Sequence, residues 1–344
     1  MRFRRSRPIV MAFYEGEIGV HNFVRQSRFA CSLECVGLLA DLEEWHSAED
    51  LLSHFPEYDI DSLSKQIYEL VWLGAVVVES TPEAEMDQSF RDTWQWGMAG
   101  GHLHFITRDA EFPKEYTKQQ LQANHSEWGL SEPSYYADSA DETDVLRLKR
   151  MDFKNPVFDL MRRRRSDTKF TDREIDVEVL ADCLFAGKGV LKVEDSGPFA
   201  GRPVTMTPSA EACNPYELYV YSRNVGGLVK GFYHYLTASH ALRRINGDDV
   251  NLPDMLGGQA WTGRSAAVIF LVAHFPRTMW TLHKPLGYRM VLMEAGFVAQ
   301  NIALVATQHG FSAVPIGSFK HSKIEAHLPL PPMTASVMLC IALG

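Results

Sequence analysis

The sequence EAGFVAQNIALVATQHGFSAVPIGSF, residues 294–319, gives the strongest indication of the fold. Small and apolar residues dominate it from Glu294 to Gly310, and no charged residue follows Glu294. Such a pattern predicts a helix that is buried nearly all round. Gln300 and Asn301 are the exceptions, because buried amides need hydrogen-bond partners. Residues 311–319 then predict a strand that enters a glycine-containing turn.

An arginine-rich segment, MRRRRSDTKF (residues 161–170), follows an apolar helical pattern. Guanidinium groups match phosphate oxygens in a bidentate manner, and the Ser166 hydroxyl adds a short donor. The segment is equally consistent with a solvated basic helix end, which the helix dipole favours. These residues alone do not decide between a phosphate site and a helix end.

A third motif, TPSAEACNP (residues 207–215), precedes a strand pattern at residues 217–221. Small residues in such a loop let backbone donors approach a flat ligand closely. An ordinary loop before a strand would have the same composition.

The order of these motifs resembles the nitroreductase family. The segments GFYHY (residues 231–235) and GYRMVLMEAG (residues 287–296) sharpen the resemblance to SagB-type dehydrogenases, which act in azole-containing peptide biosynthesis. The resemblance covers residues 145–344. It implies an α+β domain with a central antiparallel sheet flanked by helices, and an obligate homodimer that holds FMN at the subunit interface.

The resemblance also implies which residues bind the cofactor. The arginine–serine motif would hold the phosphate and the ring edge, the Pro-Ser loop would lie beneath the isoalloxazine, and the glycine turn would face flavin N5 and O4. Backbone donors there stabilise the charge that develops on a reduced flavin. The implied cofactor-binding residues are Arg164, Arg165, Ser166, Thr168, Pro208, Ser209, Ala210, Pro315, Ile316, Gly317 and Ser318.

The reaction that the resemblance implies is dehydrogenation of an azoline to an azole, in which a base removes a carbon-bound proton and hydride passes to flavin. Relatives carry a Lys-Tyr pair shortly before the Tyr-Arg that matches Tyr288 and Arg289, and this sequence has none. His283 or Lys284 could replace the base, since histidine titrates near neutrality. We therefore take His283, Lys284 and Tyr288 as the catalytic candidates. A second departure is Thr168, which stands where relatives often have a lysine or arginine.

The first 115 residues predict a winged-helix-like domain that recognises a leader peptide or a carrier. Residues 1–30 show strand alternation, helical patterns begin at Ser32, Ser47 and about Asp61, and a β-branched run follows Gly74. Winged helices recognise peptides by strand addition. The predicted third helix contains Asp61, Glu69 and a lone Lys65, and that surface disfavours DNA. Residues 116–144 predict a linker or surface arm.

Residues 93–107 are rich in aromatic side chains and are expected to pack between the domains. His102 and His104 alternate, so we expect both imidazoles on one face of a strand. Two histidines without a nearby third ligand are more often structural than metal-binding, and no metal site is predicted.

Composition excludes several classes of protein. The net charge of -9 disfavours a general nucleic-acid binder. Five cysteines without a CxxC pair predict reduced thiols, with neither a disulfide framework nor a zinc site. No signal peptide or membrane span is evident, so we expect a cytoplasmic protein without a membrane partner.

Three functions remain open on the sequence. The first is an FMN-dependent dehydrogenase (oxidase) for a peptide- or carrier-bound substrate, with a biosynthetic synthetase or cyclodehydratase as a possible partner. The second is an NAD(P)H-dependent reductase of small nitro compounds or quinones. The third is a flavin-deficient scaffold that binds a precursor peptide.

Overall fold

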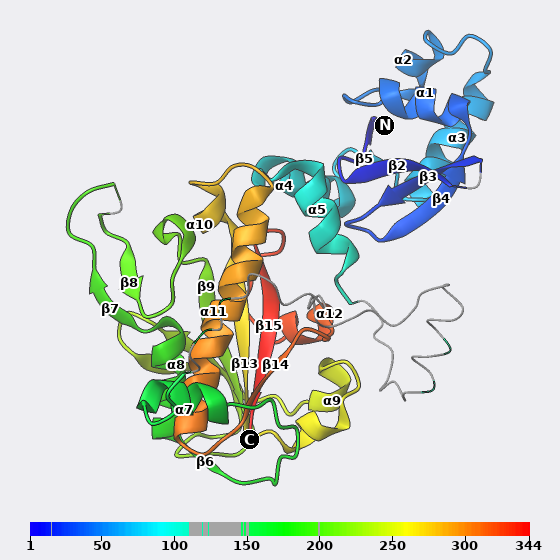
Figure 1. Cartoon of the computed structure of the whole chain (residues 1–344). Helices are drawn as coiled ribbons and strands as arrows, with labels where there is room; N and C mark the ends of the chain where they lie inside the picture. The colour runs from blue at the N-terminus through cyan, green and yellow to red at the C-terminus, as the bar shows by residue number, and fades with distance from the viewer. Residues whose placement is uncertain are drawn as a thin grey trace.

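The computed structural model describes residues 1–14, 16–109, 119, 123, 146, 148, 151–198 and 200–344. The predicted linker at residues 116–144 therefore lies almost wholly outside the described residues. Figure 1 shows a smaller N-terminal body of strands and short helices, and a larger C-terminal body built on one sheet. Two helices, α4 (Pro82–Thr93) and α5 (Gly97–Ile106), lie between the two bodies.

The C-terminal body contains a six-stranded antiparallel sheet in the order β12-β11-β9-β13-β15-β14. It confirms the predicted central antiparallel sheet flanked by helices. The strands are β9 (Tyr216–Ser222), β11 (Gly231–Leu236), β12 (Ala241–Asn246), β13 (Ala267–His274), β14 (Ala313–Ile316) and β15 (Ala335–Leu343). β13 is buried along most of its length, because helices cover both faces of the sheet.

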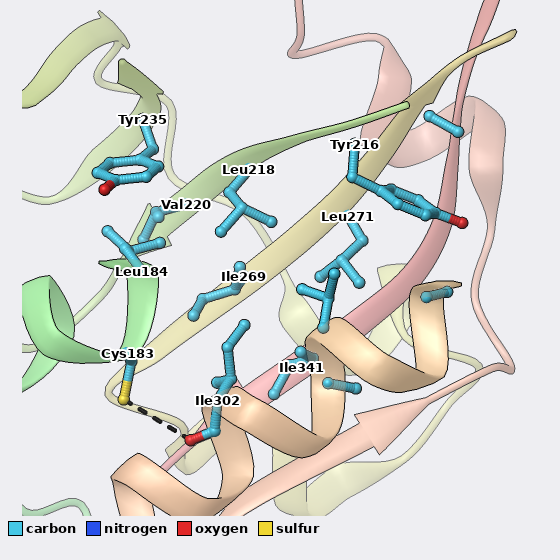
Figure 2. Packing of buried hydrophobic residues seen from close by; sticks show 14 of the residues in the cluster. Cys183, Leu184, Tyr216, Leu218, Val220, Tyr235, Ile269, Leu271, Ile302 and Ile341 are labelled. Atoms are coloured by element: carbon cyan, nitrogen blue, oxygen red, sulfur yellow. Dashed lines mark hydrogen bonds between the residues drawn. The ribbon is translucent and has the colours of Figure 1, made fainter. Parts of the chain in front are cut away.

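Helix α11 (Leu286–Gln308) lies across one face of this sheet, so the predicted helix is present. The prediction that it is buried nearly all round is wrong, because one of its faces is exposed, with Leu292, Met293 and Phe297 on it. Figure 2 shows Leu218, Ile269 and Leu271 of the strands pointing toward α11, together with Ile302 of that helix. Asn301 finds the partners that a buried amide needs, since its Nδ2 donates to Ala186 O and to Thr207 Oγ1. By length and composition α11 is the one helix of the described residues that could cross a membrane, and 44% of its most apolar window is buried inside the protein.

Helix α8 (Val177–Lys188) packs beside α11 on the same face. α7 (Pro156–Arg163) contacts α11 as well, and α10 (Phe275–Met279) lies at its N-terminal end. The opposite face of the sheet is covered by α9 (Leu252–Met255) and α12 (His321–Glu325). Shorter elements complete this body: β6 (Ile175–Asp176), β7 (Val190–Val193), β8 (Pro203–Thr205), β10 (Val225–Gly226), η1 (Ala210–Ala212) and η2 (Ala260–Arg264).

The N-terminal body has its own apolar core and the predicted order of strands followed by helices. Its elements are β1 (Phe3–Arg5), β2 (Ile9–Tyr14), β3 (Glu17–Asn22), β4 (Ser27–Cys31), α1 (Leu33–Asp41), α2 (Ala48–Leu52), α3 (Ile60–Trp72) and β5 (Val76–Val78). β2, β3 and β4 form an antiparallel sheet, and β1 pairs with β5. The three helices are present, whereas membership of the winged-helix class stays a prediction.

The prediction that His102 and His104 share a strand face is wrong, because both residues belong to helix α5. Residues two apart point to the same face in a strand but to nearly opposite faces in a helix. His102 faces His21 of β3, with 3.3 Å between ring nitrogens, while His104 is buried against Tyr288 of α11. The expected packing of this aromatic segment between the two bodies is confirmed, since Trp94, Trp96 and Phe105 join the core of the C-terminal body.

Candidate functional site

The arginine–serine motif begins at the C-terminal end of α7. Arg162 and Arg163 both pair with Asp159, at 2.5 and 2.9 Å, and they lower the pKa of that carboxyl. Arg165 turns back and donates to the carbonyl oxygen of Arg162 at 2.6 Å. Arg164 is half-buried and lies with Nη1 3.4 Å from Ser166 Oγ. Arg164 and Ser166 thus form a guanidinium–hydroxyl pair next to the helix end.

The glycine turn lies along the same edge of the sheet. Ser312, just before β14, accepts from Asp167 N at 3.2 Å and donates to Arg165 O at 3.3 Å. β14 then runs from there to Pro315 and Ile316, and leads into Gly317. The fold therefore brings the arginine–serine motif and the Pro315–Ser318 turn to the two ends of one short edge strand.

The turn itself presents backbone donors to open space. Among the described residues, the N–H groups of Gly317 and Ser318 have no acceptor, and a Cβ built on Gly317 would meet nothing within 4 Å. The Ser318 side chain is fixed by a hydrogen bond, because Gln259 Nε2 donates to its Oγ at 3.1 Å. These groups fit FMN, because a guanidinium and a hydroxyl could hold its phosphate and free main-chain N–H groups could donate to its ring.

The Pro-Ser loop is held in an unusual backbone conformation. Glu211, Ala212 and Asn214 have φ angles of 49°, 50° and 45°. Left-handed backbone is unfavourable for residues other than glycine, at roughly 1–3 kcal/mol each. Such a cluster persists only where surrounding contacts fix it, and it is typical of functional loops.

A buried ion pair lies directly behind this loop. Lys188 Nζ of α8 is 3.3 Å from Glu294 Oε1 of α11 and 2.7 Å from Asn214 Oδ1. Ser209 Oγ donates to Glu294 Oε2 at 2.6 Å and accepts from Asn214 N at 2.8 Å. Burial lowers the pKa of Lys188, and Glu294 opposes that shift. Lys188 was not identified as a site residue from the sequence. Two signals pointed to it: a lysine at the end of an apolar helix, and Glu294 as the one acidic residue at the start of an uncharged stretch.

The two groups of implied cofactor residues lie at different ends of α11. Arg163 Nη2 is 3.3 Å from Gln308 Oε1 near the C-terminal end, while Ser209 is bound to Glu294. Glu294 and Gln308 are separated by about 21 Å along a helix. That separation exceeds the length of one isoalloxazine ring system. Within one chain, the arginine–serine motif and the Pro208–Ala210 loop therefore lie at opposite ends of α11.

The catalytic candidates occupy different environments near the N-terminal end of α11. His283 and Lys284 are exposed, and His283 Nδ1 is 3.3 Å from Gln95 Oε1. Neighbouring Thr281 contacts Arg202, which also donates to the carbonyl of Glu211 in the Pro-Ser loop. Tyr288 is instead 5% exposed and its hydroxyl faces His104, so the structure gives it a partner in the core. His283 and Lys284 are the two candidates with access to a substrate.

The model of the nitroreductase family matches residues 161–344. Putative nitroreductase MJ1384 of Methanocaldococcus jannaschii is 31% identical over 174 residues, which cover 50% of this chain and 83% of that protein. The trifolitoxin-processing protein TfxB of Rhizobium leguminosarum bv. trifolii is 28% identical over 137 residues, covering 38% of this chain but only 37% of TfxB. Among solved structures, the E. coli microcin synthetase McbBCD complex with truncated pro-MccB17 aligns with a TM-score of 0.49 and 19% identity, over 68% of this chain and 83% of the other.

Proposed function

Because the chain belongs to the nitroreductase family, we propose that it is an FMN-dependent dehydrogenase acting on a peptide- or carrier-bound substrate. The observation that carries the proposal is the donor set along β14, where Arg164 and Ser166 lie at one end and the unpaired N–H groups of Gly317 and Ser318 at the other. FMN, when bound, supplies the acceptor for a hydride from carbon. The chain's residues hold that group, orient the substrate and move its proton.

A homodimer would complete the site. Leu292, Met293 and Phe297 are exposed on the outer face of α11, between 42% and 49%, and Gly296 beside them has open space above its Cα. A two-fold axis in this interface makes the contact self-complementary, and an axis perpendicular to α11 would set the two helices antiparallel. The N-terminal half of one α11 would then lie near the C-terminal half of the other. Pro208–Ala210 of one copy would then approach the Arg164 segment of its partner, from which it is separated by most of α11 within one chain.

The proton acceptor in this proposal is His283 or Lys284. Both are exposed at the end of α11 that carries the Pro-Ser loop, so in a dimer they would border the shared groove. Neutral histidine accepts a proton from carbon near physiological pH, and lysine can do so when its pKa is lowered. Tyr288 is left out of this role, since its hydroxyl lies in the core on His104.

The N-terminal body supplies a place for a peptide. Among the described strands, β4 pairs only with β3, so its other edge is open for strand addition. A groove with a cavity of about 270 Å³ lies between this edge and α3, lined by apolar and polar side chains that include Phe29, Tyr58, Gln66, Leu70 and Leu73. TfxB, a relative by sequence, is a trifolitoxin-processing protein, which favours a peptide substrate over a small quinone.

The test is anaerobic reaction of the FMN-loaded protein with a peptide that contains a thiazoline or oxazoline. We expect the visible flavin absorbance to bleach while the peptide loses two hydrogens by mass. If NADPH bleaches the flavin and the protein then turns over quinones but not the peptide, the chain is a small-molecule reductase. A protein that binds the peptide but no flavin would be a scaffold.

A further inference from the structure

We infer that Lys188 and Glu294 are positioning residues, whose buried ion pair holds the Pro208–Asn214 loop in the form that meets the flavin. The inference rests on the proposed function for its cofactor, but the loop conformation itself is independent of that function. The pair links α8, α11 and the loop, and both residues are nearly inaccessible, at 2% and 3% exposure.

The ion pair and its hydrogen bonds to Ser209 and Asn214 form one buried polar network. Lys188 Nζ binds the side-chain oxygen of Asn214, and Asn214 Nδ2 donates to Pro203 O at 2.9 Å. Glu294 uses one oxygen for Lys188 and the other for the Ser209 hydroxyl. Both ends of the loop are thereby tied to one ion pair, which lies behind the loop and away from solvent.

The carbonyl oxygens of the loop are held from outside by two arginines. Arg202 donates to the carbonyl of Glu211, and Arg277 Nη1 donates to the carbonyl of Asn214 at 3.3 Å. Glu211 and Asn214 are two of the three residues in left-handed backbone. Contacts from four elements therefore oppose the intrinsic preference of this segment for a relaxed conformation.

The network also changes the role that the resemblance implied for Ser209. Its hydroxyl proton goes to Glu294 and its oxygen accepts from Asn214 N, so the side chain points inward and serves as an anchor. The N–H groups of Ala210 and Glu211 have no acceptor among the described residues. The loop would thus meet the ring through main-chain donors, and the ion pair would set their position.

Substitutions can separate positioning from stability. Removing one partner leaves a buried charge without compensation, whereas replacing both with apolar residues of similar size is often neutral. Lys188→Met and Glu294→Leu should each destabilise the fold in urea. The double variant Lys188→Met/Glu294→Leu should regain most of that stability, although its loop has lost both anchors.

The experiment measures two properties of the purified dimer. In the double variant, FMN binding followed by flavin fluorescence should weaken by at least about tenfold, the scale of lost charged hydrogen bonds. Amide hydrogen exchange at Ala212, Cys213 and Asn214, whose N–H groups are hydrogen-bonded within the loop, should accelerate in the FMN-free protein. Asp182→Asn is the matched control, because Asp182 of α8 pairs with His309 beside α11 on the surface, at 2.9 Å. It should change neither property.

The two proposals can fail separately. A double variant that binds FMN within about twofold of wild type and keeps slow exchange in the loop overturns the positioning role. If the wild-type protein binds no FMN, the proposed function fails. The exchange measurement still decides whether the ion pair holds the loop.

Discussion

The Tyr288 hydroxyl lies 3.1 Å from Nδ1 of His104, and this contact joins α11 to the helix that leads from the N-terminal body. Trp94, Trp96 and Phe275 lie around the pair, with ring centroids 5.0–5.6 Å from the ring of His104 or Tyr288. Burial lowers the pKa of His104 well below 6.5 and raises the pKa of Tyr288. Both groups are therefore neutral in the folded protein at physiological pH.

Acid should weaken this junction. The unfolded chain binds a proton on each histidine near pH 6.5, while folded His104 does not, and the pKa of buried His321 nearby is lowered to about 4. The free energy of unfolding should consequently fall as the pH drops below 6.5, by about 1.4 kcal/mol per pH unit for each histidine. Urea unfolding at pH 7, 6 and 5.5 measures the slope. His104→Asn and His321→Asn should each flatten it, and an equally steep slope in both variants would contradict the assignment.

Arg164 and Ser166 should determine FMN affinity. Arg164→Ala/Ser166→Ala removes one guanidinium and one hydroxyl from the phosphate end, so the dissociation constant should rise by more than about tenfold. Fluorescence titration with FMN provides the measurement. Arg162→Ala is the control, because its guanidinium is already occupied by Asp159. If FMN affinity fell equally in both variants, the loss would reflect the lower positive charge of the protein and not a specific contact with Arg164 and Ser166.

Phe297→Arg should convert the protein to monomers. A charge in the middle of the exposed α11 face cannot be buried against a second copy without a partner. Analytical ultracentrifugation should show the change of mass, and FMN should be lost with the dimer. Phe13→Arg is the control, since Phe13 is 82% exposed at the far tip of the β2–β3 hairpin. A monomer that keeps FMN would place the whole site in one chain.

His283→Asn/Lys284→Met should slow substrate oxidation by about 100-fold or more, the usual contribution of a general base. FMN affinity should stay unchanged, because neither residue belongs to the implied binding set. Stopped-flow bleaching of the flavin by peptide measures the step. A full rate in the double variant would remove both residues from the mechanism.

Filling the groove beside β4 should abolish peptide docking without affecting the flavin. Gln66 lines the groove from α3 and is exposed, so Gln66→Trp would occupy the space. Fluorescence anisotropy of a labelled precursor peptide should show weakened binding. Trp72→Ala is the control, since Trp72 is 82% exposed on the same helix but does not line the groove. If only the control loses binding, the peptide docks on the other face of α3.

Local signals in the sequence predicted much of this fold. A helix, α2, begins at the expected Ser47, where Ser47 and Asp50 form a capping box, and the small-residue run after Glu294 forms most of helix α11. These features depend on neighbours within a few residues. Helix α5 was missed because Gly100 and Gly101 weaken helix propensity. A Cβ on Gly101 would come within 3.0 Å of Trp94, so tertiary packing explains that glycine.

The ion pair that anchors the Pro-Ser loop could not be predicted from the sequence, because its two residues are far apart in the chain. Lys188 and Glu294 are 106 residues apart, and only the packing of α8 on α11 brings them together. The motifs for Arg164, Ser166 and Gly317 were visible because each is a short local pattern. The separation of the arginine–serine motif from Ser209 along α11 was not visible, since it depends on where the fold places each segment.

The most direct measurement is an absorption spectrum of the purified protein, with mass spectrometry of the small molecule that heating releases. The account predicts an oxidised-flavin spectrum, the mass of FMN, and cofactor equimolar with chains in a dimer. A colourless protein that remains so after incubation with excess FMN would contradict it.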